Sequence, residues 1–506
     1  MNSFLASLVN EIVGNLFENA PTIEDLGDIF IGGNGDDNLQ GSDKDDIFLP
    51  SDGDDTVLGG NGTDVVFARN GNDTVIGQTG DDVAFLGSGD DRFIWNNGDG
   101  SDFINGGTGF DITEVNGAAD GDAFDLRQAE GQAIFNRVNL GLFTLTNEEI
   151  EQFEINGQGG DDLLTVGDLT GSEVEKVVFK GGKGNDVLDA RESYTTLEAF
   201  GGKGDDLLQG GSAEDTFYAG DGNDIVVGQR GDDTALLGKG DDRFIWNNGD
   251  GSDFIKGGQG FDVTQVNGAD DAGDEFDLRT VDGQAIFNRF NLGLFTLTNE
   301  EIEQFEINGQ GGDDSFTVGD LTGSGVQSVV FSGGDGNDFL NASGTITPIT
   351  ADGGDGDDIL IGGIGDDILI GGDGADLLIG GGGNDILIGG NGSDFFSFDT
   401  GAAFNAADIG TTVIQNFESA DKVVLDTAVF TELTSAVGGG LSASEFAVVN
   451  SDEDAALSDA LIVYGANTGQ LYYNSNGAEA GFGDGSQFAT IEGAPTLDAN
   501  SFVVQA

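Results

Sequence analysis

The chain contains no cysteine and no histidine among its 506 residues. Without cysteine, disulfide bonds cannot hold the fold together. Without histidine, the HExxH sites of zinc proteases, Ser-His-Asp triads and Cys-His dyads are all impossible. Carboxylates remain as acid–base groups, but adjacent Asp-Asp pairs occur in so many places that none stands out as a catalytic site. We therefore predict that the chain is not an enzyme.

Basic residues and long apolar runs are also scarce. Lys and Arg total 17 against 93 Asp and Glu, which gives a net charge of -76. Nucleic acid binding needs a basic surface and is excluded, and the same charge disfavours anionic membrane surfaces. No segment is apolar over a length that would span a membrane. A chain with this charge should repel itself and stay extended until counter-ions bind.

Glycine is abundant (90 residues, against 4 prolines), and its pattern is clearest at residues 353–397. Five nine-residue units follow one another there, each reading Gly-Gly-x-Gly-x-Asp and then three strand-like residues with a large apolar one in the middle. Glycines allow positive φ and turn backbone carbonyls to one side, where the aspartate adds a carboxylate. Such oxygens suit a hard cation such as Ca²⁺. The predicted ligand positions are Gly353, Gly356, Asp358, Gly362, Gly365, Asp367, Gly371, Gly374, Asp376, Gly380, Gly383, Asp385, Gly389, Gly392 and Asp394.

This pattern resembles the calcium-binding nonapeptide repeat of RTX (hemolysin-type) proteins. The resemblance implies an all-β fold, a right-handed parallel β-roll or β-helix solenoid in which two units make one turn. Loops n and n+2 would then stack and hold an ion between them. The middle side chains (Leu360, Leu369, Leu378, Leu387 and Phe396) should point inward, and the metal should supply much of the stability of so thin a core. A flexible Gly/Asp linker has no reason to keep Leu or Phe at every ninth residue.

Two earlier arrays carry the same motif with more irregularities. In the first array Lys44 replaces a glycine and Pro50-Ser51 replace the opening pair, so we expect weaker ion binding there. An insert also precedes the unit at Gly201, and another precedes Gly353. The sixth-position aspartates of these arrays, with that of the unit opening at Gly333, are Asp37, Asp46, Asp55, Asp64, Asp73, Asp82, Asp91, Asp102, Asp111, Asp186, Asp206, Asp215, Asp224, Asp233, Asp242, Asp253, Asp262 and Asp338.

The chain contains an internal duplication. Residues 92–104 recur unchanged at 243–255, and residues 140–162 recur at 292–314. Between the arrays the sequence holds recurrent strands without helical periodicity, which indicate either a wider parallel β-helix section or a small β insert. A diverged motif ends there at Asp162. The two tryptophans, at matched places in lengthened turns, favour packing in a widened turn over an aromatic ligand platform.

The two ends of the chain differ from the arrays. Residues 2–20 place apolar residues on one helical face, which predicts a capping helix, with self-association as the rival interpretation. The segment has no basic start and no continuous apolar stretch, so we do not expect a Sec signal peptide. From Asp399 onward, VIQNFESADKVVL and a hairpin turning at Asn467-Thr468-Gly469 resemble the C-terminal domain that closes the β-roll in serralysin-type proteins. The last residues resemble an uncleaved type I secretion signal.

These observations predict seven segments: a capping helix (1–22), a first array (23–114), a strand-rich module (115–180), a second array (181–265), a second module (266–332), a third array (333–398) and a C-terminal cap with the secretion signal (399–506). We expect about 15 Ca²⁺ sites, one for each pair of stacked loops. The function we predict is that of a secreted structural or adhesive protein of the bacterial exterior, exported by a type I machinery, with self-assembly or cell-surface polysaccharide as partners. The alternatives are an RTX enzyme or toxin with a cryptic carboxylate site, and a calcium-binding exoprotein that does not assemble.

Overall fold

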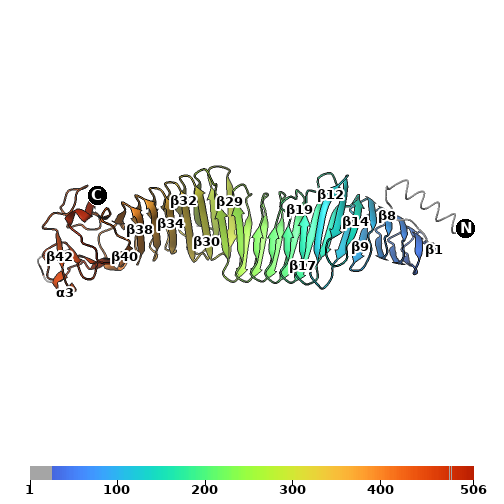
Figure 1. Cartoon of the computed structure of the whole chain (residues 1–506), viewed down its shortest axis with the longest axis horizontal. Coiled ribbons are helices and arrows are strands. Elements are labelled where there is room, and N and C mark those ends of the chain that lie inside the picture. The colour runs from blue at the N-terminus through green and yellow to red at the C-terminus, as the bar shows by residue number, and fades with distance from the viewer. Residues whose placement is uncertain (1–25, 478, 480) are drawn as a thin grey trace. The chain divides into compact units, whose positions relative to one another are not determined.

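The computed structural model describes residues 26–477, 479 and 481–506, and these residues are nearly all β (Figure 1). The helix predicted at residues 1–22 lies outside the described residues. The chain divides into two compact units. Unit 1 comprises Met1–Phe244 with Asp250–Gly260, and unit 2 comprises Ile245–Gly249 with Phe261–Ala506. Within the described part of the chain, no helix has the length and hydrophobicity needed to cross a membrane.

The nonapeptide period sets the strand register. Strand β5 (Thr56–Asn61) pairs in parallel with β7 (Thr74–Thr79), and Thr56 lies opposite Thr74, 18 residues later. The strand between them, β6 (Val65–Asn70), pairs instead with β8 (Val83–Ser88) in a second sheet. Two nonapeptides therefore make one turn of a parallel β-solenoid, which confirms the predicted fold class.

Unit 1 contains two sheets, which we call sheets 1a and 1b. Sheet 1a contains, in spatial order, β1 (Leu26–Ile31), β3 (Asp45–Leu49), β6, β8, β10 (Phe103–Thr108), β14 (Phe143–Glu148), β13 (Gln132–Arg137), β12 (Ala123–Ala129), β16 (Leu163–Val166), β18 (Val187–Asp189), β20 (Leu207–Gln209), β22 (Ile225–Val227) and β24 (Arg243–Asn247), with β4 (Ser51–Asp52) beside β6. Sheet 1b contains β2 (Asn38–Gln40), β5, β7, β9 (Arg92–Asn96), β11 (Ile112–Asn116), β15 (Gln152–Asn156), β17 (Lys176–Lys183), β19 (Thr196–Lys203), β21 (Thr216–Asp221), β23 (Thr234–Lys239) and β25 (Phe254–Gln259).

Unit 2 has the same two-sheet construction. Sheet 2a contains β26 (Val263–Asn267), β30 (Gln304–Gly311), β32 (Ser328–Asp335), β34 (Ile349–Asp355), β36 (Ile368–Gly374), β38 (Ile386–Gly392), β40 (Thr412–Gln415), β45 (Gln487–Ile491), β44 (Gln470–Tyr473), β43 (Ile462–Gly465) and β42 (Phe446–Val449). Sheet 2b contains β29 (Phe295–Glu300), β28 (Gln284–Arg289), β27 (Glu275–Val281), β31 (Ser315–Val318), β33 (Phe339–Asn341), β35 (Ile359–Ile361), β37 (Leu377–Ile379), β39 (Phe395–Phe398), β41 (Lys422–Asp426) and β46 (Phe502–Gln505).

The core between the two sheets of a unit is one side chain deep from each strand. The middle residues of the third-array triplets, from Leu360 to Phe396, are at most 1% exposed, as predicted. Both tryptophans are also buried: Trp95 stacks on Phe143 and Trp246 on Phe295, each with ring centroids 3.8 Å apart. This confirms the packing interpretation of the tryptophans.

Each strand-rich region adds one antiparallel strand to an otherwise parallel sheet. In unit 1, β12 pairs in parallel with β16, whereas β13 pairs antiparallel with both β12 and β14. Strand β14 then rejoins the solenoid beside β10. Strands β27, β28 and β29 repeat this arrangement in unit 2. Both interpretations of these regions hold in part: most of their strands continue the parallel solenoid, and one antiparallel strand, β13 or β28, is inserted in each.

The C-terminal region continues both sheets of unit 2. Strand β40 pairs with β38 and β41 with β39, so the solenoid register extends past the last nonapeptide. Strands β43 and β44 form the predicted hairpin. The short helices α2 (Ala406–Ile409) and α3 (Asp452–Ala455) and the 3₁₀ helix η1 (Ala499–Ser501) lie in this region, and Phe404, Phe430, Tyr473 and Phe488 pack together inside it.

Candidate metal centres

The sixth-position aspartates form continuous ladders. Asp376 Oδ1 accepts a hydrogen bond from the backbone N–H of Asp358, one turn earlier, at 2.9 Å. Asp394 Oδ1 accepts in turn from the N–H of Asp376 at 3.1 Å. The same bond recurs at 18-residue spacing through all three arrays, and at 20-residue spacing where a turn is lengthened, as between Asp82 and Asp102. Each carboxylate is thereby fixed between stacked loops.

The second oxygen of most of these carboxylates is buried and accepts no hydrogen bond. A buried carboxylate oxygen without a partner is costly, and a bound cation removes that cost. The predicted aspartates whose Oδ2 is in this state are Asp55, Asp64, Asp73, Asp82, Asp91, Asp102, Asp111, Asp186, Asp206, Asp224, Asp233, Asp253, Asp338, Asp358, Asp376, Asp385 and Asp394.

The opening glycine of each unit makes room for these oxygens. A Cβ on Gly371 would lie 2.3 Å from Asp376 Oδ2 and 2.5 Å from the carbonyl oxygen of Gly389, one turn later. A carboxylate oxygen and a carbonyl oxygen therefore converge above this glycine, and both are ligand types that Ca²⁺ prefers. The same convergence recurs at Gly353, with Asp358 and Gly371.

The glycines divide into two roles. Fourth-position glycines such as Gly356 (φ 141°), Gly374 (φ 153°), Gly383 (φ 115°) and Gly392 (φ 151°) adopt positive φ, as predicted. Opening glycines do not adopt positive φ, so that expectation was wrong for them: they are required by the close approach of oxygens. The other predicted glycines of the third array fit one of these two roles. Gly365 is the exception, because it is a fourth-position glycine that does not adopt positive φ.

Electrostatics agree with a cation requirement. The pKa of Asp64, Asp376 and Asp385 is raised to about 7, because burial and the charges of neighbouring aspartates together outweigh the backbone hydrogen bonds that lower it. Burial likewise raises the pKa of Asp233 to about 9. In the absence of a cation, these side chains are held in a fold that disfavours their ionised form.

Four predicted aspartates differ because their Oδ2 already has a partner. Asp37, Asp215 and Asp367 accept from the backbone N–H of Gly33, Gly211 and Gly363. Asp46 accepts from both the N–H and the hydroxyl of Ser42. Asp46 lies in the loop with Lys44, where the sequence predicted weaker ion binding. The two other predicted aspartates, Asp242 and Asp262, are buried at the same loop position.

Several ladder members were missed by the sequence motif. Asp122 and Asp274 are the first members of ladders that begin in the inserts. They donate their N–H groups to Asp162 and Asp314, respectively. Asp421 accepts from the N–H of Asp394 in the C-terminal region. None of Asp122, Asp274 and Asp421 follows the Gly-Gly-x-Gly spacing, so the motif gave no signal for them. Glu151 and Glu303 also serve as acceptors, for the N–H groups of Asp111 and Asp262, and no spacing rule would identify them.

A second ladder involves the fifth residue of each unit and runs in the opposite sense. Asp161 accepts from the N–H of Asn185, Asn185 from that of Asp205, and Asp205 from that of Asn223, at 2.8–3.0 Å. Here the side chain accepts from the following loop, whereas the sixth-position side chain accepts from the preceding one. Alternating Asn with Asp removes every second charge and so lowers the repulsion along this exposed column. The alternation of GND with GDD in the sequence was the signal for it.

In each insert, an arginine of the chain forms an ion pair with the aspartate at which the ladder begins. Arg137 forms an ion pair with Asp122 Oδ1, and the two side chains are 3% and 0% exposed. Arg137 also donates to Asn97 at 2.7 Å. Arg289 and Asp274 form the same pair in unit 2. A guanidinium therefore compensates these two carboxylates, and they need no metal.

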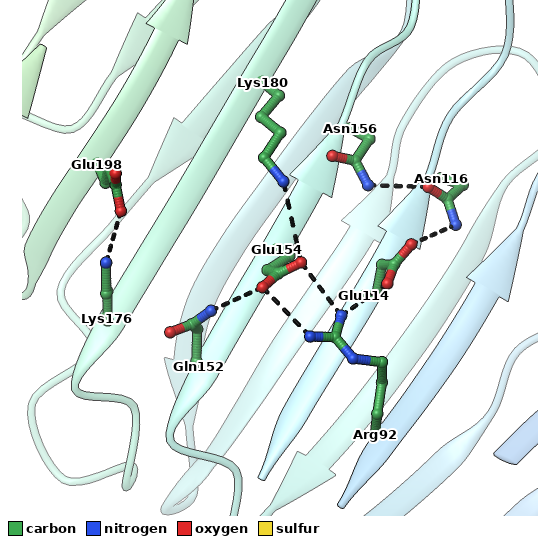
Figure 2. Close-up of polar contacts among 9 residues, drawn as sticks. All are labelled: Arg92, Glu114, Asn116, Gln152, Glu154, Asn156, Lys176, Lys180 and Glu198. Carbon is green, nitrogen blue, oxygen red and sulfur yellow. Dashed lines mark hydrogen bonds and ion pairs between the residues drawn. The ribbon is translucent and has the colours of Figure 1, made fainter. Parts of the chain in front are cut away.

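Three basic residues on the outer face of sheet 1b are also paired (Figure 2). Arg92 lies between Glu114 and Glu154, and Lys180 approaches Glu154 from the other side at 4.0 Å. Burial raises the pKa of Glu154, but the hydrogen bond and charge of Arg92 outweigh it and hold that pKa below its usual value. Lys176 pairs with Glu198 at 2.6 Å. These charges stabilise the sheet exterior.

The donor set fits Ca²⁺. Within residues 26–506, as far as they are described, no three acidic side chains gather in one metal-binding cluster. Each ion would therefore be held by sixth-position carboxylates and completed by loop carbonyls such as that of Gly389. Carbonyl-rich coordination with few carboxylates is typical of Ca²⁺ and not of Zn²⁺, which prefers nitrogen and sulfur ligands.

Comparison with known proteins agrees with this assignment. A family model described as the RTX calcium-binding nonapeptide repeat (4 copies) matches residues 31–66, 58–93, 200–235, 247–263, 328–344, 352–387 and 370–402. No curated protein matches the chain. The matched segments contain most of the ladder aspartates of the three arrays, although Asp102, Asp111, Asp186 and Asp242 lie outside them, and they leave out most of the two inserts. Over these arrays the chain is an RTX repeat protein, and its repeats bind Ca²⁺.

Proposed function

We propose that this protein is a secreted structural or adhesive component of the bacterial cell exterior, in a surface layer, sheath or matrix. The observation that carries the proposal is the run of carboxylate ladders through both units. Most of the described chain is a solenoid scaffold that carries these ladders, and the duplication adds more scaffold instead of a distinct domain. Acidic loop edges can also be cross-linked between molecules by divalent ions, although copies with a charge of -76 would otherwise repel.

Export by a type I machinery would fit the same chemistry. Extracellular calcium modules have dissociation constants of roughly 10⁻⁴–10⁻³ M, which cytosolic calcium does not satisfy. The chain would then stay unfolded inside the cell and fold outside it. The resemblance of residues 399–506 to a β-roll cap with a secretion signal supports this route.

Two experiments test the proposal. The purified protein should be largely disordered in EDTA by circular dichroism, and in millimolar Ca²⁺ it should become β-rich and form sheets, filaments or a coat on cells by electron microscopy. Deleting roughly the last 60 residues should trap the protein in the cell, because the segment outside the repeat pattern carries the export signal. Arrival of the truncated protein in the medium would refute the export route.

The outcomes also separate the alternatives. Monomers in Ca²⁺ that turn over a polysaccharide or lipid would indicate an enzyme or toxin. Monomers without turnover or cell binding would indicate a calcium-binding exoprotein with no assembly role. Either result would overturn the structural proposal while leaving the calcium ladders intact.

A further inference from the structure

Each insert presents an apolar loop to solvent. The loop between β13 and β14 (residues 138–142) exposes Val138 (55%), Leu140 (55%) and Leu142 (79%). The matching loop between β28 and β29 (residues 290–294) exposes Phe290 (49%), Leu292 (53%) and Leu294 (77%). We call these the two insert loops. Apolar exposure at three alternate positions, present twice in one chain, exceeds the scattered single residues that are normal on protein surfaces.

The insert loops also lie in stretches of the chain that have no acidic residue. Residues 131–147 and 283–299 contain no carboxylate, although Asp and Glu make up 93 of the 506 residues. The one charged side chain in each stretch, Arg137 or Arg289, is buried against an aspartate. The insert loops are therefore neutral and apolar islands on a strongly acidic chain.

The apolar side chains cannot turn inward, because each loop is fixed to the solenoid on both sides. Asn139 accepts from the N–H of Ala123 and donates to the carbonyl of Gly121, both at 2.9 Å. Asn291 makes the same two bonds with Glu275 and Gly273. At the far end of each loop, Phe143 or Phe295 is buried on a tryptophan. A loop ordered before binding loses little further entropy when a partner covers it.

We propose that the insert loops are homotypic contact surfaces through which copies of this chain associate. The net charge is our reason for choosing a second copy of the chain as the partner. Two copies, each with a net charge of -76, repel wherever their acidic surfaces meet, and the neutral insert loops are places where they can touch. Apolar residues on one copy bury those of another, and Ca²⁺ on the flanking loops reduces the remaining repulsion. This interface would serve the assembly proposed above, but it is inferred from the loops alone.

The strength of the contact follows from its size. Three side chains bury much less than the roughly 800 Å² per partner of a stable interface, so one contact should be weak and reversible. Two loops per chain give each copy two attachment points, which allows association to extend beyond dimers and gain avidity. We therefore expect concentration-dependent assembly and no discrete tight dimer.

Sedimentation velocity in saturating Ca²⁺ tests this inference. The wild-type average mass should rise with concentration, and the Leu142→Asp/Leu294→Asp double variant should remain monomeric. Either single variant should stop at dimers, because only one loop remains. The control is Ile346→Asp/Leu457→Asp, which adds the same charge at residues exposed by 61% and 71% and should assemble like the wild type. Circular dichroism verifies that all variants fold.

Three results would overturn the inference. One is undiminished assembly of the loop double variant, which keeps every carboxylate and would then be cross-linked by Ca²⁺ alone. Another is a monomeric wild type at all concentrations; if that monomer still coats cells, the adhesive function stands without the loop interface. The third is loop-dependent binding to phosphatidylcholine vesicles without self-association, which would assign the loops to lipid.

Discussion

The guanidinium of Arg289 pairs with Asp274 Oδ1 inside unit 2, and the two side chains are 1% and 0% exposed. Arg289 also donates to Asn248 at 2.7 Å, and its guanidinium carbon lies 6.0 Å from the ring centroid of Trp246. Asp274 in turn donates its N–H to Asp314, and this is the first bond of the ladder that continues through the third array. The carboxylate ladder of unit 2 thus begins at Asp274, a carboxylate whose counter-ion is part of the chain.

Replacing Arg289 with methionine should destabilise unit 2 by about 3–5 kcal/mol, because a buried carboxylate would lose its partner. The effect should persist in saturating Ca²⁺. Urea unfolding followed by Trp246 fluorescence in a Trp95→Phe background measures it. Adding Asp274→Asn should restore part of the loss by removing the unpaired charge. Equal stability of Arg289→Met and its parent would show that the pair is not structural.

Asp376→Asn should weaken calcium binding at its own site in the third array at least tenfold, about 1.4 kcal/mol, because a neutral amide replaces an otherwise unpartnered buried oxygen. Isothermal titration calorimetry should show one or more lost high-affinity ions. Asp357→Asn is the matched control, since Asp357 is an exposed fifth-position residue one turn earlier that accepts from the N–H of Ala375, the neighbour of Asp376. Similar losses in both variants would mean that net charge, not ladder position, determines affinity.

Gly371→Ala should lower both calcium affinity and the calcium-dependent melting temperature, although Gly371 lacks positive φ. The new methyl group would meet Asp376 Oδ2 and the Gly389 carbonyl oxygen, the two atoms that converge for the ion. Gly35→Ala is the control, because a Cβ there meets nothing within 4 Å. Thermal unfolding at several calcium concentrations measures the difference, and unchanged melting of Gly371→Ala would contradict the proposed site geometry.

The calcium-free protein should gain β structure on mild acidification. The pKa of Asp64, Asp376 and Asp385 is about 7 in the fold, against about 3.9 in an unfolded chain. Since the folded pKa is the higher one, the fold binds more protons than the unfolded chain. Its stability is then greatest at low pH and is lost as the pH rises through about 7.

Far-UV circular dichroism in EDTA at about pH 8 and about pH 5 measures this effect. In saturating Ca²⁺ the dependence should reverse, because protons then compete with the metal for the same oxygens. Loss of β structure on acidification in EDTA would contradict the prediction.

Much of this architecture could be predicted from the sequence, because a nine-residue period repeats the same physical constraint in each unit. Leu360 faces inward and Asp358 accepts a hydrogen bond from the preceding loop for reasons that are local to one nonapeptide. The inserts were less predictable, since the antiparallel return of β13 depends on which strands pair across long distances. The partners of Arg137 and Arg289 are likewise set only by that pairing. The fifth-position ladder was present in the sequence as an Asn/Asp alternation, but the calcium motif does not require it.

The 18-residue register fixes the increments by which this molecule can change length. Removing residues 362–379, one full turn, would put Asp394 in the place of Asp376, stacked on Asp358, and would leave each later strand in its present sheet. Removing only nine residues would transfer every later strand to the opposite sheet, and the region after Asp399 would meet the solenoid the wrong way round. Lengthened turns such as that before Asp102 add residues without adding a strand, so they preserve this parity. Even numbers of nonapeptides are therefore the units in which such a chain can be extended or shortened without refolding its end.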